Sequence, residues 1–164
     1  MQTIDMTRDE LWAFIEQKVQ QGYWLLSCDL GHPHLERLHY EYPLRVINIG
    51  IREQAAIGVA TGLAKGGQKV LVYAIGNQIL MRACEQLRFA QVNGLSFGVI
   101  GVGHKRYYGA ASGISHDADG MLETADWFNG FAEVCGIDVV AKNELPKLDN
   151  LIKTAGRPLY LPFP

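Results

Sequence analysis

The chain has 164 residues, of which 48% are hydrophobic and 20% charged, and its formal net charge is −2. This composition is typical of one globular domain, here residues 1–164, with a sizeable buried core. The slightly negative charge and the lack of a basic run argue against nucleic-acid binding. No apolar run is long enough to cross a membrane and no signal peptide begins the chain, so we expect a cytoplasmic protein that binds no membrane.

The cysteines and histidines point to no metal site and no disulfide framework. Cys28, Cys84 and Cys135 are odd in number, lie in apolar contexts and form no Cys-x-x-Cys pair. Free buried thiols are typical of a reducing compartment. His32 and His34 lie close together in a loop but lack a third ligand in the sequence, which favours a surface loop over a metal site.

Helices and strands alternate along the chain. Thr7 and Glu10 have capping-box spacing, and the apolar residues that follow at helical spacing predict an amphipathic helix ending at Gly22. A short helix is expected within 31–43, and longer ones from Glu53, from a cap at Asn77, and over 122–128 and 143–155. The expected strands are 23–28, 45–49, 69–75, 95–102, 137–140 and 158–161.

This alternation predicts an α/β fold, a three-layer sandwich with a six-stranded, mainly parallel sheet covered by helices on both faces. Ligands of such sheets bind beyond the carboxyl ends of the strands. Four segments fall at those ends, so we expect them to share one rim: Asp29, 50–53, 76–79 and 103–116. Neither a GxGxxG fingerprint nor a P-loop is present, which argues against a plain Rossmann-type nucleotide-binding module.

One motif stands out at the second expected strand. The residues 50–54 read Gly-Ile-Arg-Glu-Gln and open a helix of small residues that ends at Gly66-Gly67. Local physics offers a bland explanation for Glu53, because the helix dipole favours an acidic side chain in the first turn. The stretch nevertheless resembles the pyrimidine-binding domain of the transketolase family of thiamine diphosphate enzymes. The resemblance extends to the C-terminus, so it covers most of the chain and implies the thiamine diphosphate-binding fold.

The resemblance also implies roles for individual residues. The carboxyl of Glu53 would hydrogen-bond N1′ of the cofactor's aminopyrimidine ring and so promote loss of the C2 proton of the thiazolium; this catalytic carboxyl must be shielded from water. Ile51, from the same motif, would contact the cofactor. Ile79 stands where the family has an aromatic residue that packs on the ring. Asp29 matches an aspartate that contacts the ligand or the partner.

Two further residues match family positions that contact substrate. Arg82, in 79–86, matches an arginine that helps to place substrate near the cofactor, and the bland alternative is a surface helix arginine. His116, in 113–116, matches a catalytic histidine that contacts substrate oxygens or shuttles protons, and the bland alternative is a solvated loop histidine.

The departures from the family pattern concern the substrate. Ser112 replaces the acidic residue four positions before the loop histidine, and the arginine of the following helix is missing from 124–129. Both differences weaken the case for an ordinary sugar phosphate. Lys105 and Arg106 lie in the expected rim loop and would compensate for the missing charge.

The helix that begins at Glu53 has a face without bulk, formed by Ala55, Gly58, Thr61 and Gly62. Glycine inside a helix costs about 1 kcal/mol, so this face is expected to allow close approach of another helix or backbone. The resemblance places the corresponding helix near a subunit interface, which implies self-association. Packing within the chain remains a compatible explanation.

The sequence lacks the family's second half. The Gly-Asp-Gly motif that holds the diphosphate through a metal is absent, and 118–120 is only a partial echo. The third domain of a full transketolase has no counterpart either. The resemblance therefore implies a separate diphosphate-binding partner that holds Mg²⁺ or Ca²⁺, with thiamine diphosphate shared at the interfaces of an α2β2 heterotetramer.

The resulting hypothesis is the pyrimidine-binding subunit of a split transketolase-like enzyme that transfers a two-carbon ketol unit from a ketose donor to an aldehyde or aldose acceptor. A split 2-oxo acid decarboxylase or dehydrogenase uses the same cofactor and would release carbon dioxide. A non-catalytic assembly subunit is the alternative from another class, which Ile79 and Ser112 favour and the Glu53 motif disfavours.

Overall fold

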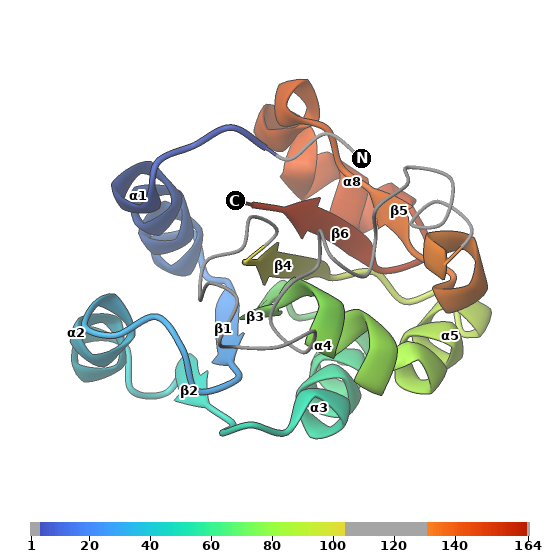
Figure 1. Ribbon diagram of the computed structural model, residues 1–164, viewed down its shortest axis with the longest axis horizontal. Helices are drawn as coiled ribbons and strands as arrows, with labels where there is room; N and C mark the ends of the chain where they lie inside the picture. Colours follow the sequence, from blue (N-terminus) through green and yellow to red (C-terminus); the bar gives the residue numbers. More distant parts are fainter. Residues whose placement is uncertain (1–3, 104–130, 164) are drawn as a thin grey trace, which may run out of the picture.

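The computed structural model describes residues 4–103 and 131–163 and contains a six-stranded parallel sheet (Figure 1). The strands are ordered β2-β1-β3-β4-β6-β5, and every neighbouring pair is parallel. Their bounds are β1 Trp24–Ser27, β2 Val46–Asn48, β3 Val70–Ile75, β4 Gly98–Val102, β5 Asp138–Val139 and β6 Leu159–Pro162. The expected strands are all present, although the two outer ones are short.

Helices cover both faces of the sheet (Figure 1). One core joins the sheet to α1 (Arg8–Gln20), α2 (His34–Glu41) and α8 (Leu148–Thr154), which contribute Leu11, Leu38 and Leu148. The other core joins the opposite face to α3 (Glu53–Lys65), α4 (Gly76–Arg82) and α5 (Cys84–Val92). The predicted three-layer α/β sandwich is confirmed.

The first helix begins and ends as its sequence predicts. The backbone N–H of Glu10 donates to Thr7 Oγ1 at 3.2 Å, and the backbone N–H of Thr7 donates to Glu10 Oε2 at 2.7 Å, which completes the capping box. The chain turns after the helix at Gly22, whose φ of 90° suits glycine.

Three expectations about helices need correction. Asn77 does not cap a helix, because α4 already begins at Gly76 and Asn77 is buried within it. The helix expected to continue from there breaks at Ala83, which separates α4 from α5. The helix expected over 143–155 starts as a 3-10 helix, Lys142–Lys147, because Pro146 has no N–H to donate to an α-helical ladder. The helix expected over 122–128 lies outside the described residues.

The small-residue face of α3 is open rather than packed. Ala55, Gly58 and Gly62 are exposed, and a Cβ built on either glycine meets no described atom within 4 Å. Thr61 is the one buried residue of the expected face, and its hydroxyl donates to the carbonyl of Ile57 at 2.7 Å. Contacts among the described residues therefore give these glycines no packing reason. Among residues 4–103 and 131–163, no helix is long and apolar enough to cross a membrane.

Candidate functional site

The turn between β2 and α3 sets the position of Glu53. Gly50 has a φ of 78°, a backbone conformation that favours glycine. The side chain of Asn48, the last residue of β2, accepts a hydrogen bond from the Gly50 N–H at 2.9 Å. Beyond this turn, α3 begins with Glu53. The carboxyl group thus lies in the first turn of a helix, where the helix dipole stabilises a negative charge.

Glu53 is a buried carboxylate with one charged partner. Its residue is 4% exposed, and the guanidinium Nη1 of Arg82 donates to Oε1 at 2.8 Å. Arg82 ends α4, and its side chain is 45% exposed. No hydrogen bond to the second oxygen, Oε2, comes from residues 4–103 or 131–163. The carboxyl is therefore shielded from water, as the motif requires, and one of its oxygens is left for another group.

The Glu53 cleft, about 510 Å³ in volume, opens beside this ion pair. It is lined by Ile51, Arg52, Glu53, Gln54, Ala55 and Arg82. Ile51 is 67% exposed and supplies apolar surface to the cleft. The cleft thus combines an apolar wall with a shielded carboxylate and two guanidinium groups.

A buried thiol lies close to this carboxylate. Burial raises the pKa of Cys28 to about 12, and the negative charge of Glu53 contributes to the rise. Cys28 follows β1 and is 2% exposed. A thiol with so high a pKa stays protonated at neutral pH, which makes Cys28 a poor nucleophile.

Not every residue assigned to the cofactor lies in this cleft. Ile79 is fully buried in the core beneath α3 and α4 and does not line the Glu53 cleft, so its role as a cover for the ring stays a prediction. The substrate role of Arg82 also stays a prediction. His116, Ser112, Lys105 and Arg106 lie outside the described residues.

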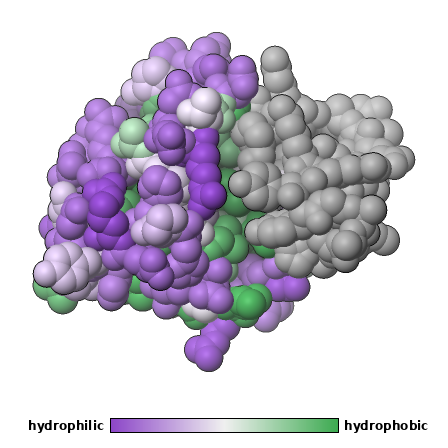
Figure 2. Space-filling model, turned by 60° about the vertical axis from the view of Figure 1, so that its left-hand side comes forward, coloured by the Kyte–Doolittle hydropathy of each residue, from purple (hydrophilic) through white to green (hydrophobic). Residues whose placement is uncertain are grey.

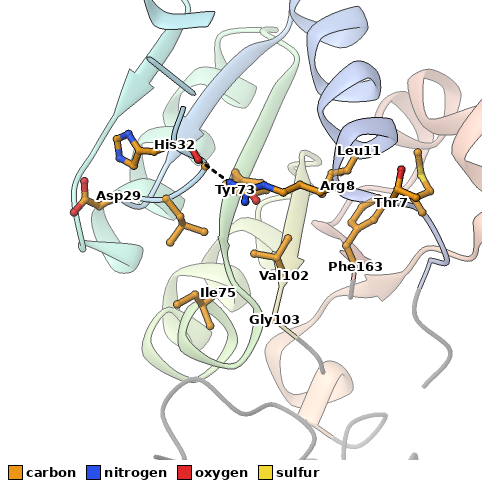
Figure 3. A pocket seen from close by; sticks show the side chains of 13 residues that line it. Thr7, Arg8, Leu11, Asp29, His32, Tyr73, Ile75, Val102, Gly103 and Phe163 are labelled. Atoms are coloured by element: carbon orange, nitrogen blue, oxygen red, sulfur yellow. Dashed lines mark hydrogen bonds between the residues drawn. The ribbon is translucent and has the colours of Figure 1, made fainter. Parts of the chain in front are cut away.

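Asp29 lies in a second cleft, the rim cleft, at the carboxyl ends of the strands (Figure 3). This cleft of about 590 Å³ is lined by apolar side chains and by polar or ionisable ones. The apolar ones are Met6, Leu11, Leu30, Ile75, Val102 and Phe163, and the others are Thr7, Arg8, Asp29, His32 and Tyr73. The face that carries α1 and α2 is mainly hydrophilic, but hydrophobic residues show between the hydrophilic ones toward its middle (Figure 2). The described part of the predicted rim thus includes both the rim cleft and the Glu53 cleft, while its segment 104–116 lies outside the described residues.

Asn48 connects the two clefts. Its Nδ2 donates to Asp29 Oδ1 at 2.9 Å, and its Oδ1 accepts from the backbone N–H of Asp29 at 3.1 Å. The same Oδ1 accepts from Gly50, at the start of the turn that carries Glu53. Asp29 has a φ of 61°, so these bonds hold it in a left-handed conformation that aspartate adopts more readily than most residues. Sequence reasoning missed Asn48, for which the only signal is its place at the end of a strand.

Arg8 is the other residue that sequence reasoning missed, and it contacts the loop that holds His32. The guanidinium Nη2 of Arg8 donates to the carbonyl oxygen of His32 at 2.7 Å and so crosses the rim cleft (Figure 3). The His32 ring lies 3.0 Å from Glu36 Oε1, while His34 stacks on Trp12 with ring centroids 5.2 Å apart. The two loop histidines therefore have separate partners.

No protein-family model matches the chain. It is 47% identical over 69 residues to an uncharacterized 33.6 kDa protein in the fasciation locus of Rhodococcoides fascians, and 31% identical over 80 residues to a subunit of the apulose-4-phosphate transketolase of Actinobacillus succinogenes. It is also 43% identical over 53 residues to a 1-deoxy-D-xylulose-5-phosphate synthase of Bacillus cytotoxicus.

These matches cover 41%, 48% and 32% of this chain, in the same order. The chain is similar to transketolase-like enzymes over about half of its length. The matched stretches span 22%, 26% and 8% of the relatives' own lengths, so most of each relative has no counterpart in the match. One of these relatives is itself named as a subunit.

Proposed function

We propose that this chain is the pyrimidine-binding subunit of a split, thiamine diphosphate-dependent transketolase-like enzyme. The observation that carries the proposal is the carboxylate of Glu53, shielded at the N-terminus of α3 with one oxygen unbonded by any described group, beside an open cleft. The partial similarity to a protein named as a transketolase subunit supports it.

The donor groups of the Glu53 cleft suit the aminopyrimidine end of the cofactor. Glu53 Oε2 is available for the ring nitrogen N1′, and Ile51 and Ala55 supply apolar wall for the ring. Glu53 is the only carboxylate in the lining of this cleft, as far as the described residues form it, whereas a divalent cation needs several oxygen ligands. We therefore assign the diphosphate, and the Mg²⁺ or Ca²⁺ that accompanies it, to a partner subunit.

Thiamine diphosphate, when bound, supplies the electron sink that cleaves a carbon–carbon bond next to a carbonyl. Glu53 holds a proton at N1′, and its burial strengthens that hydrogen bond by excluding water. Arg82 fixes Oε1, so that Oε2 is the oxygen presented to the ring. The proposed substrate-binding residues are Arg82, His116, Ser112, Lys105 and Arg106.

The proposed reaction is the transfer of a two-carbon ketol unit from a ketose to an aldehyde or aldose acceptor. The proposed assembly is an α2β2 heterotetramer. The open face of α3, with Ala55, Gly58 and Gly62, is the surface through which two copies of this chain would approach one another, because a helix without bulk permits close contact. A split 2-oxo acid decarboxylase or dehydrogenase would use the same groups and is distinguished by carbon dioxide release.

A non-catalytic assembly subunit is the second candidate, and one observation favours it. The Glu53–Arg82 ion pair satisfies one carboxylate oxygen within the chain itself, as expected of a structural contact at the end of two helices. In such a subunit the pair stabilises the junction of α3 and α4 and never exchanges with a cofactor.

Isothermal titration calorimetry with thiamine diphosphate and Mg²⁺ separates the two candidates. The chain is titrated alone and again with a candidate diphosphate-binding chain, for which a gene neighbour is the first choice. Binding that requires both chains and disappears in Glu53→Ala supports the proposal. A formed complex that binds no cofactor contradicts it and favours the assembly subunit.

A matched substitution controls for the charge change. Glu85 lies in the first turn of α5, so Glu85→Ala removes a carboxylate from a similar helix position outside the Glu53 cleft. Cofactor binding is expected to persist in Glu85→Ala. Its loss there would show that the effect of Glu53→Ala is general destabilisation.

A further inference from the structure

Two of the three cysteines lie in direct contact, although 51 positions separate them in the sequence. Cys84 is the first residue of α5, and Cys135 ends the helical segment at 131–135. Their Sγ atoms are 2.9 Å apart, and both thiols are free. Cys135 is fully buried, whereas Cys84 is only partly buried. Cys84 is therefore the more exposed residue of the pair, and its Sγ contacts the Sγ of the buried Cys135.

This geometry is close to that of a disulfide. A disulfide bond has an S–S distance of about 2.05 Å, so the sulfurs must move together by less than the length of one bond. Their helices already pack within one core, which contains Cys135 and has Cys84 at its edge. The third thiol, Cys28, lies near Glu53 instead and provides an internal reference.

We propose that Cys84 and Cys135 form a site of reversible oxidation that takes low-molecular-weight disulfides as its oxidant. The inference does not depend on the proposed function. The Cys84 thiolate attacks one sulfur of the small disulfide, forms a mixed disulfide and releases one thiol. Cys135 then loses its proton and attacks Cys84 Sγ, which releases the second thiol. Two protein thiols become one disulfide, and the reagent's disulfide is reduced to two thiols.

The order of attack follows from the surroundings of the two sulfurs. Burial raises the pKa of the Cys135 thiol, and its hydrogen bond to Cys84 raises it further. Cys135 is therefore a poor first nucleophile. Arg88 lies four residues after Cys84, about one helical turn along α5, and its positive charge opposes the rise in the pKa of Cys135. Cys84 reacts first because it is the more exposed residue of the pair.

The bond would fix the junction between α4 and α5. Cys84 lies two residues after Arg82, and the chain breaks its helical course at Ala83 between them. The Leu87 N–H donates to the Ala83 carbonyl at 2.9 Å, so the first turn of α5 begins at this break. A disulfide to Cys135 tethers this turn to residues 131–135 and restrains the segment that presents Arg82 to Glu53.

The test uses the full chain, reduced and then exposed to oxidised glutathione at several ratios to the reduced form. Free thiols are counted with a chromogenic reagent in denaturant, and non-reduced digests are analysed by mass spectrometry. The expected result is a fall from three free thiols to one, with a peptide cross-link between Cys84 and Cys135 and full reversal by dithiothreitol. Hydrogen exchange at the first turn of α5 is expected to slow on oxidation.

Three variants define the pair. Cys28→Ala is expected to oxidise as the parent does, with no free thiol left. Cys135→Ala is expected to stop at a mixed disulfide on Cys84, and Cys84→Ala is expected to retain both remaining thiols. The disulfide closes a long loop and is expected to raise the Tm of the parent by about 5–10 °C.

Four outcomes of the oxidation experiment would overturn the proposal. They are a stable mixed disulfide on Cys84 in the parent, cross-links between chains, a bond that involves Cys28, or three free thiols under conditions that oxidise dithiothreitol. A Cys84–Cys135 bond that forms only after the chain unfolds, detected by circular dichroism, also contradicts it.

Discussion

Two charged clusters at opposite ends of the sheet differ in how completely their carboxylates are bonded. Asp149, in the first turn of α8, accepts hydrogen bonds from Lys18, Tyr23 and Lys69, and two of these donors immediately precede β1 and β3. Glu53, beyond the carboxyl end of β2, accepts from Arg82 through Oε1, while Oε2 has no donor among residues 4–103 and 131–163. The first carboxylate is used by the fold, while the second remains available to a ligand.

The two clusters also differ in which partner of the ion pair is buried. At the Asp149 cluster the cation is the buried partner, since the side chain of Lys18 is 7% exposed and that of Asp149 is 39% exposed. At the Glu53 cleft the carboxylate is the buried partner, at 5%, and the arginine is half exposed. The solvated guanidinium of Arg82 can leave Glu53 for water, which frees the carboxylate for another partner. The ammonium of Lys18 is buried and donates to Gln21 and Asp149, so breaking these bonds would leave a buried charge unpaired.

The largest expected effect is on activity at the Glu53 cleft. Glu53→Gln keeps the size and polarity of the side chain but cannot hold a proton in the same way, so on the proposed function we expect kcat of the proposed assembly to fall by about 10²–10⁴-fold. The measurement is steady-state turnover with the partner subunit, with circular dichroism as the check on folding. Unchanged turnover would remove Glu53 from the chemistry.

A stability effect is expected at the other cluster. Lys18→Met keeps the length of the side chain and leaves Asp149 with Tyr23 and the more distant Lys69. We expect the free energy of unfolding in urea to fall by about 1–3 kcal/mol, because Asp149 is partly solvated and the full cost of a buried unpaired charge does not apply. An equal loss in Arg82→Met would show that the two clusters are equally structural.

The same cluster predicts a pH dependence. Burial raises the pKa of Asp149, but the hydrogen bonds from Lys18 and Tyr23 outweigh burial and hold it below the ordinary value of 3.8. A lowered pKa stabilises the fold above the unfolded value, and this contribution is lost as the pH falls through the folded value. We expect the free energy of unfolding to decline below about pH 4 more steeply in the parent than in Asp149→Asn, measured by urea unfolding at each pH.

The smallest effect concerns the open face of α3. Gly58→Ala adds a methyl group that meets no described atom within 4 Å, so we expect the isolated chain to gain about 0.5–1 kcal/mol. Gly67→Ala is the matched control and is expected to destabilise, because its φ is 77°. If α3 packs against a second copy, sedimentation will show weaker association for Gly58→Ala. Unchanged association would leave this face outside the interface.

Local rules allowed much of the fold to be predicted. The capping box at Thr7 and the turn at Gly22 depend on neighbouring residues only, and both are confirmed. The order of strands and helices along the chain predicted the parallel sheet, because strands that alternate with helices pair in parallel. Asn77 was misassigned because the chain enters α4 directly from β3 without a side-chain cap, which no local pattern reveals.

The candidate site was harder to predict, because its geometry depends on contacts between distant segments. The motif at 50–54 identified Glu53, and its burial agrees with the expectation. The pairing with Arg82, 29 positions away, depends on how α4 packs beside α3, and the bridge from Asn48 to Asp29 depends on how β1 pairs with β2. The Cys84–Cys135 contact also joins segments that are distant in the sequence. The number and spacing of the cysteines argued against a disulfide framework, but they cannot predict which cysteines the fold brings together.

The strand order has a consequence for the order in which the chain can fold. β6, Leu159–Pro162, lies between β4 and β5 and pairs with both. Until these residues leave the ribosome, β5 has no neighbour in the described sheet and one edge of β4 has none, and the Ile4 N–H also lacks its acceptor, the carbonyl of Pro162. This side of the sheet therefore assembles only after translation has passed β6. Nascent chains arrested shortly before residue 159 would present the bare edge of β4 to chaperones or to other chains.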